Sequence, residues 1–276
     1  MKQKKGRKVV RRRVEKVVRL MEMNWKEIEG ANKDAILFLT VGPMEEHGPH
    51  LPVGTDFLIA KHVEKEAMKA LEKEGIETIS LPSLPIGCCR MASDFPGSIS
   101  VNWKAVRDVI YTILHSVSKM GFKYVIICNF HMDPHHIKAI HSAMDKVKGI
   151  NVCEPFSAYH YAGNLWPPIE EEGEVHADMK ETSIALALFP KLVKEWQKLP
   201  PVKIKMDGPD ALFKTMKEMG AEQGYVGAPS LANEEYGKKF MEKLVKICID
   251  TSKSMIEGEQ LPSLPTKIKL LLKLIK

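Results

Sequence analysis

Five acidic and imidazole side chains, placed in two short segments of the 276-residue chain, are the strongest candidates for chemistry. Each segment contains two such residues separated by one position, so both side chains of a pair can point to the same side of an extended backbone. A mixed set of imidazole and carboxylate ligands suits Zn²⁺, Mn²⁺ or Fe²⁺ rather than Ca²⁺ or Mg²⁺ alone. We therefore predict a metal centre with the ligands Glu45, His47, Asp56, His131 and Asp133.

The carboxylates in this set favour a centre for two divalent ions. Two such ions lie roughly 3.5–4 Å apart when they share a bridging carboxylate. Asp56 follows a loop rich in proline and glycine and precedes an expected helix, whose backbone amides can orient its side chain. A Glu-x-His pair on a loop is more often solvated surface than a metal site, so the prediction rests on the whole segment 42–56.

Two apolar runs, 35–41 and 124–128, come directly before the two segments. Their nearly continuous apolar character favours strands buried on both faces, although this pattern alone does not exclude a buried helix. Sites in open parallel sheets form beyond the carboxyl ends of the strands. The two segments can therefore meet at one edge of a sheet, although they lie far apart in the sequence.

Strands and helices are expected to alternate along the rest of the chain. Further strands are expected within 76–84 and 150–153, and apolar residues at helical spacing predict helices over 60–71, 106–120 and 238–255. This alternation predicts an α/β fold with three layers (α/β/α), in which helices cover both faces of a mostly parallel central sheet.

The two ends of the chain are more basic than its middle. We therefore expect a basic N-terminal extension (1–24), one central domain (25–258) and a basic amphipathic C-terminal tail (259–276). The two ends account for much of the net charge of +6. Basic tails can attract nucleic acid or anionic lipid, but the charge is not spread through the fold and no RNA-binding motif occurs. We expect no nucleic-acid partner and no membrane partner.

The cysteines and the apolar segments indicate a cytoplasmic protein. The five cysteines are an odd set without the spacing of a disulfide framework, which favours reduced thiols. No segment is long and apolar enough to span a bilayer, and no apolar signal core follows the basic start. A hydrophobic content of 44% allows the full core of a compact enzyme.

Segment 45–56 reads Glu-Glu-His-Gly-Pro-His-Leu-Pro-Val-Gly-Thr-Asp and resembles the Glu-x-His-Gly-Pro-His-Leu-Pro-x-x-Thr-Asp hallmark of the creatininase family. Four further segments resemble motifs of that family in the same order: 95–100, 129–131, 176–183 and 224–232. The resemblance implies a metal-dependent amidohydrolase that cleaves a carbon–nitrogen amide bond with a metal-activated water. It also implies a homo-oligomer, often a hexamer in the family.

The resemblance assigns the ligands to two ions. Glu45, Asp56 and His131 would hold one ion. His47, Asp56 and Asp133 would hold the other ion, so that Asp56 bridges the pair. Asp133 stands where creatininase itself has Glu, and its side chain is shorter by one methylene group.

Two further residues match the family motif in segment 176–183. His176 would stand near the substrate, where its near-neutral pKa would allow it to protonate a leaving amine. Glu181 would orient the ligands or the bridging water. Either Asp133 or His176 would pass the proton to the leaving nitrogen.

The residues expected around the substrate depart from the family pattern. Loop 88–94 lacks the Ser and His common in relatives, and an acidic run (170–174) lies where creatininase has a Trp-Asp pair. We therefore expect a small or cyclic amide other than creatinine. The predicted substrate-binding residues are Arg90, Met132 and Cys89, of which Arg90 would either pair with a substrate carboxylate or phosphate or form a surface ion pair.

Three alternatives remain open from the sequence. The first is a peptidase of the same fold that trims a short peptide. The second is a formamide deformylase acting on a nucleotide-like intermediate, in which Arg90 would meet a phosphate. The third is a metal-binding scaffold without catalysis, against which the joint presence of the metal-ligand set, His176 and Glu181 argues.

Overall fold

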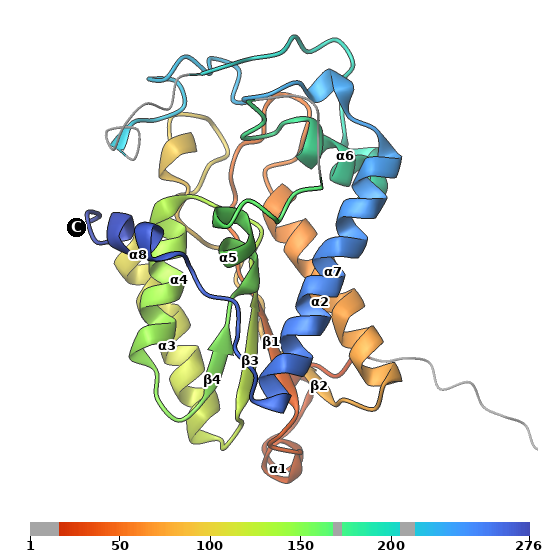
Figure 1. Ribbon diagram of the computed structural model, residues 1–276, viewed down its shortest axis with the longest axis vertical. Helices are drawn as coiled ribbons and strands as arrows, with labels where there is room; N and C mark the ends of the chain where they lie inside the picture. The colour runs from red at the N-terminus through yellow and green to blue at the C-terminus, as the bar shows by residue number, and fades with distance from the viewer. Residues whose placement is uncertain (1–16, 168–172, 205–212) are drawn as a thin grey trace, which may run out of the picture.

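A four-stranded, fully parallel sheet in the order β2-β1-β3-β4 lies at the centre of the computed structural model, which describes residues 17–167, 173–204 and 213–276 (Figure 1). The strands fall within the four predicted runs and confirm the parallel sheet. Their bounds are β1 (Ile36–Thr40), β2 (Thr78–Ser80), β3 (Tyr124–Cys128) and β4 (Asn151–Cys153).

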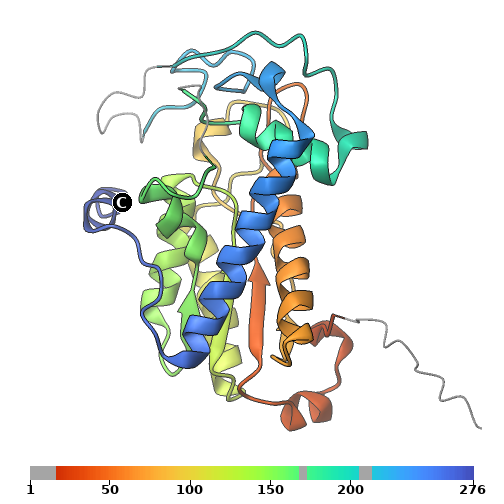
Figure 2. The same ribbon diagram turned by 45° about the vertical axis from the view of Figure 1, so that its right-hand side comes forward.

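Helices cover both faces of the sheet, which confirms the three-layer prediction (Figures 1 and 2). The pair α3 and α4 lies on one face, and the pair α2 and α7 lies on the other. The helices are α1 (Trp25–Gly30), α2 (Thr55–Lys73), α3 (Trp103–Lys119), α4 (Pro134–Lys146), α5 (Pro155–Tyr161), α6 (Met179–Leu188), α7 (Glu234–Glu257) and α8 (Thr266–Leu272). Short 3₁₀ turns occur at Leu20–Glu22, Arg90–Ala92, Pro190–Leu192 and Pro229–Leu231.

The alternation of side chains along β1 explains how one strand supports two cores. Successive strand residues point to opposite faces. Ile36 and Phe38 pack with α2 and α7, whereas Leu37 and Leu39 pack with α3 and α4. All four side chains are fully buried. The central strands are therefore apolar on both faces, as their continuous apolar runs predicted.

The predicted helices begin several residues earlier than their apolar periodicity indicated. Asn102 and Asn233 accept hydrogen bonds from backbone N–H groups of the first turns of α3 and α7. Such caps satisfy amides that have no partner within the helix, so the first turn forms before the apolar pattern starts.

The structure describes the predicted C-terminal tail but only part of the predicted N-terminal extension. Residues 1–16 of the predicted basic extension lie outside the described residues. Part of the predicted C-terminal tail forms α8, which contacts α4. Leu272 of α8 and the flanking residues Leu264 and Ile275 pack around Ile137 of α4. Among the described residues, no helix is both long and apolar enough to cross a membrane.

Candidate metal centre

The two predicted ligand segments meet beyond the carboxyl ends of β1 and β3, at the upper end of the sheet in Figure 1. Glu45 and His47 lie in the loop after β1, and His131 lies in the loop after β3. Asp56 occupies the first turn of α2. Each of the four side chains belongs to a residue no more than 6% exposed, so the cluster is sheltered from solvent.

Asp56 presents one carboxylate oxygen to each of two groups of side chains. Its Oδ2 lies 3.0 Å from His131 Nδ1, which is also 3.0 Å from Glu45 Oε2. Its Oδ1 lies 3.3 Å from His47 Nε2, which is 3.8 Å from Glu181 Oε2. A carboxylate placed between two donor groups in this way can bridge two ions.

The donor atoms fit a divalent metal ion. Glu45 Oε2, His47 Nε2 and Asp56 Oδ2 are buried and have no hydrogen-bond partner among the described residues. Leaving a buried polar atom without a partner costs about 1–3 kcal/mol, so three such atoms in one cluster suit a metal ion as their common partner. Donor atoms lie within 4.8 Å of one another in three groups: Glu45–Asp56–His131, His47–Asp56–Glu181 and Glu45–His47–His176.

Asp133 lies outside these three groups and caps a helix instead. Its Oδ1 accepts a hydrogen bond from the backbone N–H of His135 (2.7 Å), and its Oδ2 accepts one from the N–H of Met91 (3.4 Å). Pro134 starts α4 directly after it, and aspartate before such a start is a preferred cap. The geometry therefore differs from the predicted set, in which Asp133 stood beside His47.

Glu181 takes the position beside His47 and Asp56 that the sequence assigned to Asp133. Its Oε2 also accepts the backbone N–H of Ala177 at 2.6 Å. Ala177 has a φ of +45°, which L residues rarely adopt, and this turn links His176 to the start of α6. Asp178 caps α6 by accepting the N–H groups of Lys180 and Glu181, which fixes the first turn of that helix.

The backbone of Cys88 orients one of the imidazoles. Its carbonyl accepts a hydrogen bond from His131 Nε2 at 2.7 Å, so Nε2 carries the hydrogen and Nδ1 is left for a metal ion. Its N–H donates to His136 Nδ1 at 3.3 Å. Gly87 leaves room for this arrangement, because a Cβ there would lie 2.8 Å from the His136 ring. Sequence reasoning missed these contacts, since a backbone carbonyl has no residue-type signature.

Opposite charges perturb the titration of the cluster. Burial lowers the pKa of His47, but Asp56 and Glu181 together bring this pKa to about 9. Burial also lowers the pKa of His131, but Glu45 and Asp56 raise it well above its usual value. Burial raises the pKa of Asp56, yet the two imidazoles hold it well below its usual range. Burial raises the pKa of Glu181 to about 7. Without metal, the imidazoles of His47 and His131 are therefore protonated near neutral pH.

Metal binding should release protons and tighten as the pH rises. A metal ion requires the neutral imidazole of His47, but with a pKa of about 9 the metal-free ring is protonated at pH 7. Zn²⁺ affinity should therefore increase between pH 7 and 9, and the binding of the ion that His47 holds should release at least about one proton at pH 7. Titration calorimetry in buffers of different ionisation enthalpy measures this release. Affinity independent of pH over this range would contradict the assignment of His47.

The predicted substrate residues lie around the loops near the centre. The Arg90 guanidinium donates a hydrogen bond to the Phe213 carbonyl at 2.7 Å. Cys89 is buried, and burial raises the pKa of its thiol to about 12, which argues against a thiolate nucleophile. Met132 is half-buried between the apolar clusters of α7 and α8. Substrate binding by Arg90, Cys89 and Met132 therefore stays a prediction.

Only part of the acidic run falls in the described residues. Residues 170–172 lie outside them. Glu174 is half-buried, and its carboxylate accepts the backbone N–H groups of Met179 (2.7 Å) and Ala228 (2.8 Å). These contacts therefore connect the start of α6 to the loop that contains Ala228.

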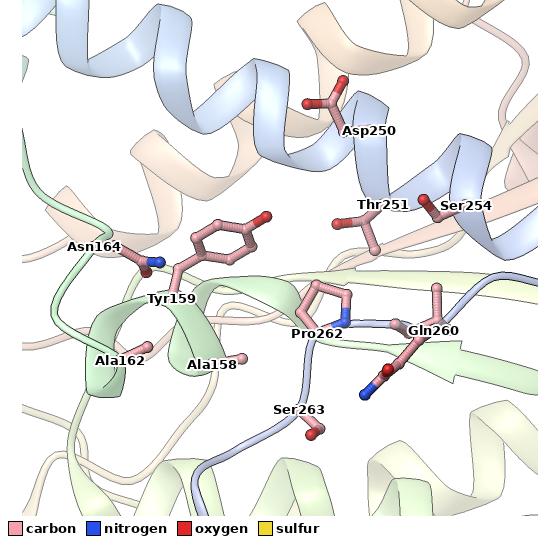
Figure 3. Close-up of a pocket in the computed structure, with 11 residues that line it drawn as sticks. Ala158, Tyr159, Ala162, Asn164, Asp250, Thr251, Ser254, Gln260, Pro262 and Ser263 are labelled. Atoms are coloured by element: carbon pink, nitrogen blue, oxygen red, sulfur yellow. The ribbon is translucent and has the colours of Figure 1, made fainter.

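A pocket of about 490 Å³ lies away from the metal centre, between α5, α7 and the segment that follows α7 (Figure 3). None of the candidate ligands lines it. Two of the polar side chains on its α7 side are engaged locally: Asp250 pairs with Lys246 at 2.7 Å, and Ser254 donates to Glu259 at 2.7 Å. This pocket does not contribute to the chemistry of the centre.

Comparisons with known proteins identify the family of the chain. A family model described as Creatininase (creatinine amidohydrolase) matches residues 21–251. The creatinine amidohydrolase of Pseudomonas putida is 25% identical over 202 residues, which are 62% of this chain and 72% of the relative. The 3-dehydro-scyllo-inosose hydrolase of Thermotoga maritima is 28% identical over 251 residues (81% and 78%). The mycofactocin precursor peptide peptidase of Mycolicibacterium smegmatis is 25% identical over 228 residues (79% and 84%).

Solved structures share the fold. A structure described as creatininase Mn has a TM-score of 0.69 and 22% identity, over 87% of this chain and 99% of that one. A crystal structure of creatinine amidohydrolase has a TM-score of 0.67 and 22% identity, over 85% and 96%. At this identity the structures support the fold, whereas the family model covers well over half of the sequence. The chain therefore belongs to the creatininase family.

Proposed function

We propose that this protein is a metal-dependent amidohydrolase that cleaves a carbon–nitrogen amide bond in a small molecule other than creatinine. The observation that carries the proposal is the buried Asp56 carboxylate, whose two oxygens face two separate groups of ligand atoms. Family membership supports hydrolysis but leaves the substrate open, because the named relatives act on creatinine, an inosose and a precursor peptide.

Two divalent ions would fit the donor set, with zinc, manganese and iron all suited to it. Glu45, Asp56 and His131 would hold one ion. His47, Asp56 and Glu181 would hold the other. When bound, such ions supply a water activated at neutral pH and polarise the scissile carbonyl.

His176 is the group best placed to move a proton for the substrate. Its ring lies 4.5 Å from the His47 ring, and its side chain is 13% exposed, so a substrate can reach it. Burial lowers the pKa of His176, but Glu45 and nearby carboxylates raise it to about 10 in the absence of metal. A ring held in its protonated form can deliver a proton to a leaving nitrogen.

Glu181 and Asp133 provide a paired test of the second ion. Glu181→Gln should lower the affinity for the second ion by at least about 10–100-fold, because even the loss of a residue that only orients a metal ligand costs this much. Asp133→Asn should leave the number of bound metals unchanged, because its carboxylate caps α4. Elemental analysis after dialysis against graded chelator measures both. If Asp133→Asn loses one metal and Glu181→Gln keeps both, Asp133 is the ligand, as predicted from the sequence.

A substrate panel tests the activity itself. The metal-loaded protein would be offered creatinine, other cyclic amides, formamides, short peptides and 3-dehydro-scyllo-inosose. We expect turnover of an amide other than creatinine, abolished by a chelator and restored by metal. Turnover of creatinine as the best substrate, or of no amide at all, would contradict the proposal.

A peptidase is the second candidate function. It is favoured by the similarity to the mycofactocin precursor peptide peptidases, which extends over 79% of this chain for the relative from Mycolicibacterium smegmatis. The same metal centre would serve, since a peptide bond is an amide. Turnover of short peptides in preference to small amides would select this candidate.

A further inference from the structure

Glu46 is the point at which four of the family-like segments meet. Its Oε2 accepts the N–H of Gly48 at 2.9 Å in its own loop, and its N–H donates to Ser98 Oγ at 3.1 Å. Its carbonyl accepts a hydrogen bond from His176 Nε2 at 2.9 Å. The backbone of Gly224 lies so close that a Cβ there would overlap the Glu46 carboxylate. Segments 45–56, 95–100, 176–183 and 224–232 therefore all contact this one residue.

The surroundings of His176 Nε2 determine which ring nitrogen carries the hydrogen. Nε2 faces the Glu46 carbonyl at 2.9 Å and lies 3.7 Å from Glu46 Oε1. Both oxygens only accept hydrogen bonds when the carboxylate is ionised. A neutral imidazole has one donor nitrogen and one acceptor nitrogen. In the neutral ring, Nε2 is therefore the donor, and Nδ1 is the nitrogen left to exchange a proton.

The Glu46 side chain is held in place for this role. The residue is only 6% exposed, and its Oε1 has no hydrogen-bond partner among the residues that the structure describes. Its other oxygen is fixed by Gly48 N–H. A carboxylate oxygen beside Nε2 disfavours the other tautomer, in which the Nε2 lone pair would face two acceptors.

We propose that Glu46 is a positioning residue whose carboxylate acts with its backbone carbonyl to hold His176 as the Nε2–H tautomer, so that Nδ1 exchanges the proton with the substrate. This inference rests on the proposed role of His176. Gly224 has a φ of +73° and leaves the space that the Glu46 carboxylate occupies, which gives segment 224–232 a part in the active site. In many catalytic sites an acceptor hydrogen-bonds one ring nitrogen of a histidine, while the other ring nitrogen exchanges a proton with the reacting groups.

Glu46→Gln tests the proposal with little change of shape. The amide oxygen would still accept Gly48 N–H, so the amide NH₂ would replace the carboxylate oxygen that lies 3.7 Å from His176 Nε2, while the backbone carbonyl of residue 46 would remain 2.9 Å from Nε2. Residue 46 would then offer Nε2 one acceptor and one donor in place of two acceptors, which weakens the preference for Nε2–H. Long-range ¹H–¹⁵N spectra of histidine-labelled, zinc-loaded protein, recorded as the pH is raised until the rings are neutral, report the tautomer. His176→Gln identifies the signals of this ring. We expect Nε2–H in the wild type and a shift toward Nδ1–H in Glu46→Gln.

Activity gives a second readout on the best amide of the substrate panel. We expect kcat to fall by about 10–100-fold in Glu46→Gln, with KM and metal content unchanged. Glu154→Gln is the matched control, because Glu154 is a buried carboxylate that accepts the N–H groups of Phe156 and Ser157 and contacts none of the candidate ligands. It should keep the wild-type tautomer and kcat.

An Nδ1–H ring at His176 in the wild type would overturn the proposal, whether or not the variant folds. An unchanged Nε2–H tautomer in folded Glu46→Gln would assign the tautomer to the backbone carbonyl alone and would overturn the role of the carboxylate. The spectra need no substrate, so the tautomer of His176 tests the role of Glu46 even if the wild type shows no activity. An inactive wild type would contradict the proposed function alone.

Discussion

An Asp56→Ala variant should bind neither metal ion and should lose all hydrolysis. Asp56 is the only residue shared by the Glu45–Asp56–His131 group and the His47–Asp56–Glu181 group among the described residues. Its removal leaves each group with two ligand side chains in place of three. Stable divalent sites use three protein ligands or more, so both ions should be lost together when His176 acts as a proton donor and not as a ligand in the Glu45–His47–His176 group.

Elemental analysis of dialysed protein gives the result as metals per chain. Asp56→Asn is a useful companion variant, because it keeps the shape and removes the charge that both ions share. Far-UV circular dichroism confirms that each variant is folded. A folded Asp56→Ala protein that retains two metals per chain would exclude the bridging role.

A His176→Ala variant should keep its metals and lose turnover, with kcat lower by about 10²–10⁴-fold, the usual contribution of a general acid or base. The ring lies 4.5 Å from His47, and its Nε2 is engaged by the Glu46 carbonyl. KM should change little, because the proton is needed during the reaction rather than on binding. Steady-state kinetics on the best amide substrate separates the two parameters.

The metal content decides between two roles for His176. A nitrogen of this ring lies within 4.8 Å of ligand atoms of Glu45 and His47, so the geometry would also suit a ligand. Loss of metal in His176→Ala would select that role, and unchanged kcat would remove His176 from the mechanism. His141→Ala is the control, since this half-buried ring on α4 hydrogen-bonds Ser157 at 3.0 Å, away from the candidate ligands.

The sequence was sufficient to predict that the two candidate ligand segments meet at one edge of the sheet. The apolar runs before Glu45 and His131 form β1 and β3, and their side chains are apolar throughout because both faces of these strands are buried. Parallel strands end at the same edge of the sheet, which is why segments more than 70 positions apart meet there.

The remaining features depend on contacts that residue types do not reveal. Asp133 has the spacing of a ligand, but the same aspartate before Pro134 has the pattern of a helix cap, and in the structure its carboxylate caps α4. The carbonyl groups of Cys88 and Glu46 orient two imidazoles. A backbone carbonyl is present in every residue, so only the fold shows which one is used.

Anomalous diffraction from crystals of the zinc-loaded protein, recorded on both sides of the zinc absorption edge, tests the central claim most directly. The account predicts two zinc peaks about 3.5–4 Å apart with the Asp56 carboxylate between them. A single peak, or two peaks that do not share Asp56, would contradict the two-metal centre.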